Sequence, residues 1–135
     1  MRNINSTVLH KWFHEVWNNE NEQAIDELMA DDAIARGITD ENSQRGREGV
    51  KAFFHDFKSR FSDVKVIVED VVREDDMEVA RCRVIATQTD TGKTVEFAGL
   101  SMGKIKDGKI AEAWNHFDFL GLYQQLGHSL VANAS

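Results

Sequence analysis

The 135-residue sequence contains no proline, a single cysteine and no hydrophobic run long enough to span a membrane. Because the chain has no proline-rich or low-complexity tract, the sequence predicts no linker. Its length predicts one domain over residues 1–135. The lone cysteine, Cys82, excludes an internal disulfide and a thiolate metal cluster. Its apolar surroundings, "EVARCRVIA", predict an inert buried thiol instead of a reactive one.

Positive charge is also scarce. The formal net charge is −7 and the pI about 5.2, and the basic residues are scattered. A protein that binds nucleic acid needs a basic surface to displace counterions, so we expect no nucleic-acid partner. The N-terminus lacks the apolar core of a signal peptide, which predicts a cytoplasmic protein without membrane association.

The common catalytic motifs are missing as well. "TGKT" at 91–94 resembles the end of a phosphate-binding loop but lacks the preceding glycine, so a hairpin turn explains it better. No nucleophile elbow or dinucleotide fingerprint is present. His10 and His14 are four residues apart on a predicted helix, but they lie away from its apolar stripe and are expected to be exposed. We therefore predict no metal site and no cofactor.

The first half of the sequence has helical periodicity. Apolar residues recur at helical spacing from Val8 to Trp17, and a short second helix carries Ala24, Ile25, Leu28 and Met29. "DDAIARG" is compatible with one brief strand, and residues 38–46 read as an exposed loop. A third helix, about Arg47 to Arg60, has phenylalanines along one side, a pattern typical of core packing.

After Asp63 the pattern changes to strands. Four segments rich in β-branched and aromatic residues are separated by turn signals, of which Asp107-Gly108 is the strongest; they are "VKVIVEDVV", "EVARCRVIATQT", "TVEFAGLSMGKI" and "KIAEAWNHFDF". Such short connections predict an antiparallel meander. The sequence therefore predicts an α+β fold, in which a curved antiparallel sheet packs on three N-terminal helices and encloses a pocket.

One segment of the last strand combines aromatic and ionisable residues. Trp114, His116 and Asp118 alternate and would share one face of a strand. An aspartate in an apolar pocket could have a raised pKa and exchange protons near neutral pH, with His116 as a second titratable group. The alternative is structural: Asp118 pairs with Arg81 or Arg83, and His116 bonds the backbone. Spacing alone favours this alternative.

Several segments resemble the SnoaL-like polyketide cyclase family of the nuclear transport factor 2-like superfamily. They run in the family's order from Trp12 to Gly127 and include "NNENEQAIDELMADDA", "RGREGVKAFFHDF", "FSDVKVIVEDVVREDDMEVARCRV" and "KDGKIAEAWNHFDFLGLYQQLG". The resemblance implies a cone-shaped α+β barrel that dimerises through its sheet. It also implies that Asp118 faces the pocket as general acid/base for an aldol ring closure that needs no cofactor. Two histidines usual in the cyclases are missing, from "AIARG" and "LSMGKI".

Two functions follow as hypotheses. The first is a cofactor-free cyclase or isomerase acting on a carbonyl-bearing small molecule, with Asp118 as acid/base and His116 assisting. The second is a non-catalytic module that binds a hydrophobic ligand or mediates assembly. Both require pocket walls, for which the candidates are Trp12, Trp17, Phe54, Phe57 and Trp114.

The strands also predict a homodimer. In "VEFAGLSMGKI", Val95 and Phe97 fall on one face, while Ala98, Leu100 and Met102 fall on the other. The helices can cover only one of these faces, and monomers seldom expose an apolar patch of the kind left on the other. Face-to-face pairing of two sheets would bury it. The alternative is a monomer whose second face is shielded by the C-terminal "SLVANAS" segment and by the aliphatic stems of the strand lysines and arginines.

Overall fold

The computed structural model describes residues 4–38 and 46–133 of the chain. A short 3-10 turn, η1, precedes the first helix, and the first helix continues directly into a π-helical segment, η2. The elements are η1 (Ile4–Ser6), α1 (Val8–Trp12), η2 (Phe13–Asn18), α2 (Gln23–Leu28), β1 (Met29–Arg36), α3 (Gly46–Arg60), β2 (Phe61–Glu74), β3 (Met77–Gln88), β4 (Thr94–Lys106), β5 (Lys109–Phe117) and α4 (Phe119–Gln125).

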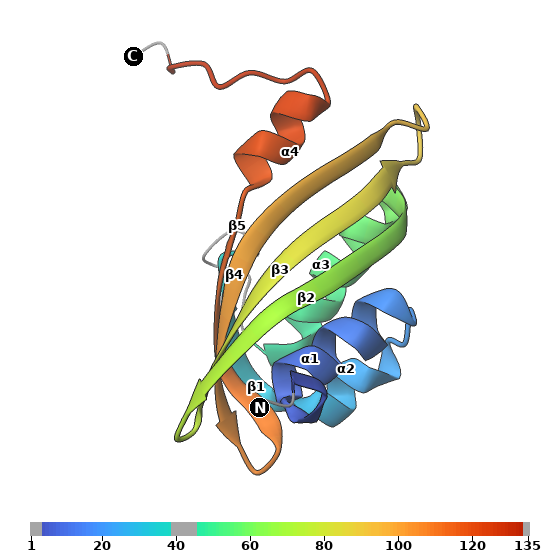
Figure 1. Ribbon diagram of the computed structural model, residues 1–135. Coiled ribbons are helices and arrows are strands. Elements are labelled where there is room, and N and C mark those ends of the chain that lie inside the picture. The colour runs from blue at the N-terminus through green and yellow to red at the C-terminus, as the bar shows by residue number, and fades with distance from the viewer. Residues whose placement is uncertain (1–3, 39–45, 134–135) are drawn as a thin grey trace.

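The five strands form one curved, open sheet in the order β1-β5-β4-β3-β2 (Figure 1). Strands β2 to β5 form the predicted antiparallel meander. Strand β1, predicted as a brief strand, pairs parallel to β5 and makes the sheet mixed instead of purely antiparallel. A parallel neighbour requires a long crossover connection, and here the whole of α3 and the meander separates β1 from β5. Met29, predicted at the end of a helix, begins β1.

The turn between β4 and β5 is built as its sequence predicts. Asp107 has a φ of 54° and Gly108 a φ of 76°, and Lys106 pairs with Lys109 across the turn. Two consecutive residues with positive φ make the two-residue turn whose twist suits a hairpin, and Asp-Gly adopts it readily.

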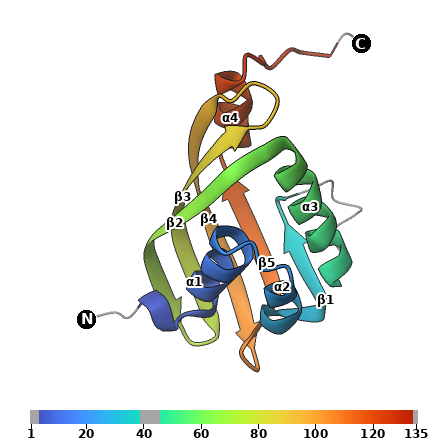
Figure 2. The ribbon, with the colours of Figure 1, turned by 90° about the vertical axis from the view of Figure 1, so that its right-hand side faces the viewer.

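Helices α1, α2 and α3 lie on one face of the sheet, as predicted (Figures 1 and 2). Their apolar stripes meet the inward side chains of the strands in a single core, which includes Leu9, Ile25, Phe57, Val84 and Ile110. The start of α1 is held by the buried carboxylate of Glu78 in β3. Its oxygens accept hydrogen bonds from the backbone N–H groups of Val8 at 3.2 Å and Leu9 at 2.9 Å.

The fourth helix, α4, was not predicted, because its residues were assigned to the last strand and the segment after it. It follows the end of β5 and lies beside β4 (Figure 1). The Gln125 side chain holds it there. Its Nε2 donates to the Glu96 carbonyl at 2.7 Å, and its Oε1 accepts from the Glu96 N–H at 3.0 Å. A side-chain amide thus pairs with the edge of β4 where β5 has ended.

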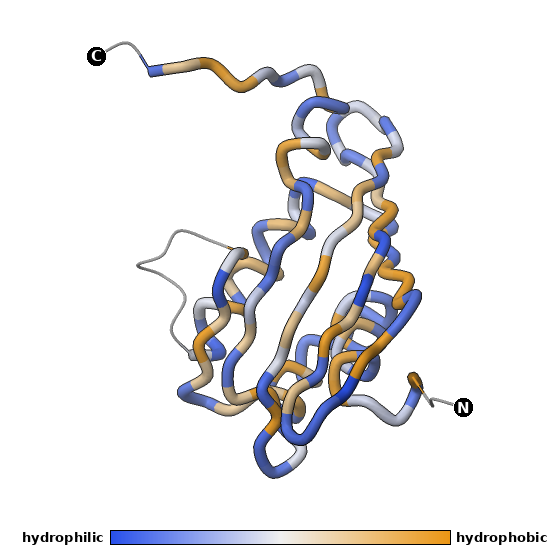
Figure 3. The backbone as a smooth tube through the Cα atoms, turned by 60° about the vertical axis from the view of Figure 1, so that its left-hand side comes forward, coloured by the Kyte–Doolittle hydropathy of each residue, from blue (hydrophilic) through white to orange (hydrophobic). Residues whose placement is uncertain are grey.

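The opposite face of the sheet carries no helix among the described residues, and exposed apolar side chains share it with ion pairs such as Arg81–Asp70 and Arg83–Glu96. Hydrophobic and hydrophilic residues alternate along the strands (Figure 3). Val95 and Phe97 are separated from Leu100 and Met102 as the alternation predicts: the first two are buried, whereas Leu100 and Met102 are 49% and 37% exposed. One row crosses four strands by direct pairing; its members are Val72, Val79, Met102 and Trp114. We call this surface the outer face.

No helix within residues 4–38 and 46–133 is long and apolar enough to span a membrane.

Candidate functional site

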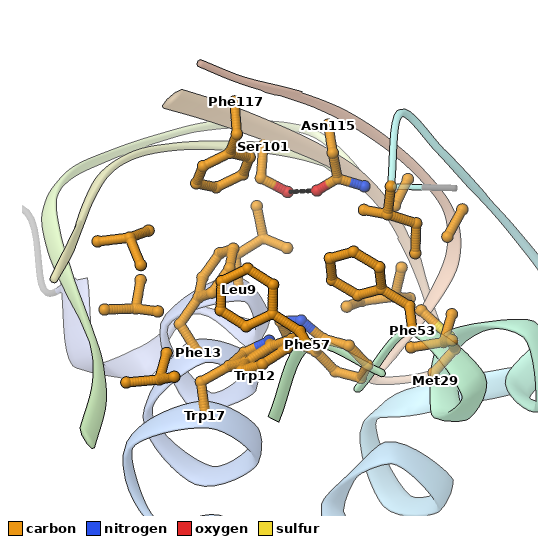
Figure 4. A pocket seen from close by; sticks show the side chains of 18 of the residues that line it. Leu9, Trp12, Phe13, Trp17, Met29, Phe53, Phe57, Ser101, Asn115 and Phe117 are labelled. Carbon is orange, nitrogen blue, oxygen red and sulfur yellow. Dashed lines mark hydrogen bonds between the residues drawn. The ribbon is translucent and has the colours of Figure 1, made fainter. Parts of the chain in front are cut away.

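A cavity of about 80 Å³ lies between the inner face of the sheet and the helices (Figure 4). It is open on one side. The wall is almost entirely apolar and aromatic, and it draws residues from every strand and from α1, η2, α3 and α4. The residues that line it are Leu9, Trp12, Phe13, Trp17, Met29, Ala35, Ile38, Val50, Phe53, Phe57, Val64, Val66, Val84, Phe97, Ser101, Ile110, Ala113, Asn115, Phe117 and Phe119.

Two aromatic residues of the cavity wall are partly exposed to solvent and lie against each other. Phe53 of α3 and Phe119 of α4 are both half-buried, and their ring centroids lie 6.5 Å apart in an edge-to-face arrangement. Phe119 also contacts Phe97 and Phe117, at 5.7 and 6.3 Å between centroids. The unpredicted helix α4 therefore contributes a partly exposed aromatic side chain to the cavity wall.

Two tryptophans form the helix side of the cavity. Trp12 and Trp17 are 8% and 9% exposed, and Trp17 meets Phe57 edge-to-face at 5.6 Å. Neither indole N–H has a hydrogen-bond acceptor anywhere in the described part of the chain, yet neither nitrogen is fully enclosed by protein atoms. Buried indole N–H groups normally find a partner. These two are donors available to a molecule in the cavity.

The sheet side carries the only polar side chains among the described lining residues apart from the indoles. Ser101 of β4 and Asn115 of β5 are direct neighbours in register. The Ser101 Oγ donates to the Asn115 Oδ1 at 2.9 Å, and the Asn115 Nδ2 donates to the Arg36 carbonyl at 3.0 Å. Ser101 is only 3% exposed. The pair faces the tryptophans across the cavity (Figure 4).

No ionisable side chain lines the cavity among the described residues. The polar groups that remain are neutral: one hydroxyl, one amide and two indoles. Neutral groups can bind and orient a carbonyl or a hydroxyl, but none of them has a pKa suited to carrying protons near neutral pH. The groups present can therefore hold and orient a neutral ligand.

The prediction that Trp114, His116 and Asp118 face the pocket is wrong. Asp118 is exposed and serves as the N-cap of α4, its Oδ1 accepting from the Gly121 N–H at 2.8 Å. His116 is exposed, and Trp114 lies on the outer face with the Arg36 guanidinium 5.6 Å from its ring centroid. None of the three lines the cavity.

A β-bulge explains this error. Lys104 pairs with Glu112, but Ile105 pairs with Ile110, so Ala111 is an extra residue in β5. One extra residue reverses which side chains face inward. Ile110 is buried, and strict alternation from it would turn Trp114 and His116 inward. Beyond the bulge the cavity instead receives Ala113, Asn115 and Phe117.

The alternative prediction, that Asp118 pairs with Arg81 or Arg83, names the wrong partner. Arg81 bonds Asp70 and Arg83 bonds Glu96, so neither arginine reaches Asp118. Asp118 is indeed structural, but its partner is a backbone N–H in its own helix.

Three of the predicted wall residues do line the cavity: Trp12, Trp17 and Phe57. Phe54 is buried, and its ring packs against Trp17 at 5.2 Å outside the lining. Ser101 and Asn115 were not predicted as site residues. For Ser101 the signal was available, because it shares the alternation of Val95 and Phe97 and is the one polar residue on that inward set.

Other candidate groups lie outside the site. His10 and His14 stack with centroids 5.8 Å apart; His14 is exposed and His10 half-buried, and burial together with His14 lowers the pKa of His10. Among the described residues, no three His, Cys, Asp or Glu side chains are grouped to hold a metal ion.

Comparison with known proteins agrees with this architecture. The family model for SnoaL-like polyketide cyclases matches residues 7–126. No curated protein sequence matches the chain significantly. A solved structure from Acidithiobacillus ferrooxidans, named as a candidate polyketide cyclase, has a TM-score of 0.82 at 23% identity over 93% of this chain and 98% of its own.

Two Streptomyces structures are also similar to the chain. TsrD from Streptomyces laurentii has a TM-score of 0.78 at 24% identity, covering 89% of this chain and 92% of its own. IdmH from Streptomyces antibioticus, also named as a candidate polyketide cyclase, has a TM-score of 0.75 at 27% identity, covering 86% and 94%. Since the family model covers most of the sequence, the chain belongs to the SnoaL-like polyketide cyclase family.

Proposed function

We propose that this protein binds a small, uncharged, largely apolar molecule in the cavity between sheet and helices and does not itself perform acid–base chemistry there. The observation that carries the proposal is the lining: aromatic and aliphatic side chains with the Ser101–Asn115 pair and two indoles as the only polar groups among the described residues. This is the second of the two hypotheses drawn from the sequence.

The physical argument concerns charge and size. Moving an ionised group into an apolar cavity without a partner is costly, so a charged ligand is disfavoured. Burying apolar ligand surface contributes roughly 25 cal/mol per Å². The cavity encloses about 80 Å³, whereas pockets for drug-sized ligands measure roughly 300–1,000 Å³. The ligand is therefore small, or it places one end in the cavity and the rest beside Phe53 and Phe119.

One observation favours a second candidate, a cofactor-free cyclase or isomerase: the match to the cyclase family and to IdmH. Ring closure of this kind needs a positioned base. Asp118 and His116 are poor candidates for that base, because both are exposed and neither lines the cavity. The binding function therefore has the better support.

The test is a substitution whose larger side chain fills the cavity. Ala113 is 5% exposed and lines it, so Ala113→Leu should abolish binding of acetophenone measured by calorimetry. It should also abolish retention of any small molecule found by native mass spectrometry of the purified protein. The matched control is Ala98→Leu, the same change on the exposed outer face, which should bind normally. Equal affinity in both variants, with both folded, would contradict the proposed site.

We further propose that two copies pair through the outer face. Support comes from the exposed apolar residues Leu100 and Met102 and from the apolar row that runs to Trp114. The C-terminal segment offers no shield, because Leu130 and Val131 are 80% and 74% exposed and the segment extends away from the sheet (Figure 1).

A further inference from the structure

The polar pair of the cavity has a fixed direction of hydrogen bonding. The Arg36 carbonyl can only accept, so the Asn115 amide must turn its Nδ2 toward it, at 3.0 Å. That leaves the Oδ1 facing Ser101 at 2.9 Å. An amide oxygen can only accept, and therefore the Ser101 hydroxyl must donate its single proton to Asn115.

Ser101 consequently meets the cavity as an acceptor. Its proton is committed, and what remains on Oγ is lone pairs. If the hydroxyl turned its proton toward a ligand, two oxygens would face each other at 2.9 Å with no proton between them. A ligand group beside Ser101 is thus preferred when it can donate. The backbone at the end of β1 sets this preference from outside the cavity.

The opposite side has the opposite polarity. The indole nitrogens of Trp12 and Trp17 are donors only. Both residues are more than nine-tenths buried, and neither N–H has an acceptor in the described part of the chain. Neither nitrogen is fully enclosed by protein atoms, so each N–H can donate to a ligand, and this side is preferred by a group that accepts.

We propose that the cavity binds its ligand in one orientation, with a hydroxyl or N–H donating to Ser101 and a carbonyl or ether oxygen accepting from Trp12 or Trp17. The ligand class is then an uncharged hydroxy-carbonyl or related molecule with its donor and acceptor at opposite ends. This inference rests on the proposed binding function and adds the orientation in which the ligand is bound.

The first experiment uses four probes with one aromatic skeleton: 4-hydroxyacetophenone, acetophenone, 4-ethylphenol and ethylbenzene. They carry both groups, the acceptor alone, the donor alone and neither. Titration calorimetry, at a pH at which the phenols are neutral, gives the four affinities. Because one hydrogen bond contributes a factor of about 5, we expect 4-hydroxyacetophenone to bind most tightly, with each single-group probe between it and ethylbenzene.

Matched variants show which side chain causes each gain in affinity. Ser101→Ala should remove the advantage of the phenol hydroxyl and leave acetophenone affinity unchanged. Of Trp12→Phe and Trp17→Phe, the variant that lacks the indole bonded to the ketone should lose the advantage of the ketone group. It should keep the advantage of the phenol hydroxyl. Trp114→Phe is the control, because Trp114 lies on the outer face and should not affect any probe.

A spectroscopic readout tests the orientation without relying on variants. The chain has three tryptophans, so its nitrogen–proton correlation spectrum should contain three indole signals. Acetophenone should move the signal of Trp12 or Trp17 downfield, as expected for a hydrogen bond to a carbonyl, and ethylbenzene should not. The Trp114 signal should stay in place with both.

The outcomes separate the inference from the function on which it rests. If no probe binds saturably, the binding function fails, and the inference fails with it. If all four bind with equal affinity, the cavity binds apolar molecules but has no polarity, and only the inference is overturned. Loss of phenol preference in Trp12→Phe and Trp17→Phe, with ketone preference lost in Ser101→Ala, would reverse the orientation and also overturn it.

Discussion

Asp118 caps α4 by accepting a hydrogen bond from the backbone N–H of Gly121, at 2.8 Å. The carboxylate therefore belongs to the start of a helix whose first residue, Phe119, lines the cavity. Gly121 leaves room for this contact, since a Cβ built there would overlap the Asp118 carboxylate. The residue predicted as the catalytic base thus acts on the cavity indirectly, by fixing the helix beside it.

Replacing Asp118 should affect stability more than binding. Asp118→Ala removes the cap and should lower the free energy of unfolding by about 1 kcal/mol, whereas asparagine caps nearly as well and Asp118→Asn should be close to neutral. Urea unfolding gives the stabilities, and acetophenone titration gives the affinities, which should change little in both variants. Loss of ligand turnover in Asp118→Asn, at unchanged affinity, would instead restore the acid/base role.

Much of the fold could be predicted from the sequence because local patterns specify it. The alternation of Val95, Phe97, Leu100 and Met102 predicted two separate faces of β4, and Asp107-Gly108 predicted the turn that follows it. The site could not be predicted equally well. Alternation places residues on two faces, but a bulge that exchanges the faces, such as the one at Ala111, leaves no periodic signal in the sequence.

Two contacts were beyond any local pattern. The amide of Asn115, which the bulge turns inward, is oriented by the Arg36 carbonyl, 79 positions away. Helix α4 is short and is held by Gln125 bridging to Glu96, so its stability comes from a tertiary contact rather than from helical periodicity. Such features depend on the parallel placement of β1 and on where β5 ends, which the sequence did not reveal.

Glu78 should be one of the most sensitive charged residues in the chain. It is 1% exposed, and its carboxylate accepts from the N–H groups of Val8 and Leu9. Glu78→Ala leaves both donors without this acceptor and should cost at least about 3 kcal/mol, since each of the two hydrogen bonds to a charged group contributes about 1.5–3 kcal/mol. Thermal and urea unfolding measure the loss.

The control for Glu78 is Glu74→Ala, which removes the same charge from an exposed position in the neighbouring strand. It should change the free energy of unfolding by less than about 0.5 kcal/mol. If Glu78→Ala were equally mild, the helix start would not depend on the carboxylate. Glu78→Gln should be intermediate, because one of its two groups can still accept.

Cys82 should make stability fall at alkaline pH. Burial raises the pKa of its thiol to about 12, against 9.0 for the exposed group. The folded chain therefore keeps its proton in a range where the unfolded chain has lost it, so this contribution is complete below pH 9.0 and declines as the pH rises toward 12. Unfolding free energies of the wild type and of Cys82→Ala, compared across this range, should show a steeper decline in the wild type.

Thiol labelling provides an independent check on Cys82. Because the residue is fully buried and protonated at neutral pH, a maleimide should react only as fast as the chain opens, and denaturant should accelerate the reaction. Rapid labelling of the native protein at neutral pH would contradict the buried, inert thiol. Parallel declines of wild type and Cys82→Ala would show that other groups cause the alkaline loss.

The last prediction concerns the outer face: we expect a homodimer that depends on Leu100 and Met102. These residues lie on the central strand β4, 49% and 37% exposed, beside the ring of Trp114. Pairing two such faces about a two-fold axis would bury them, and Leu100→Lys with Met102→Lys would place four like charges in that contact. Sedimentation should give twice the 15.3 kDa chain mass for the wild type and the single-chain mass for the double variant. Val131→Lys is the control, because Val131 is 74% exposed in the segment that extends away from the sheet, and its introduced charge should leave the dimer intact. A wild-type mass near 15.3 kDa at low concentration would contradict the dimer and leave the outer face solvated.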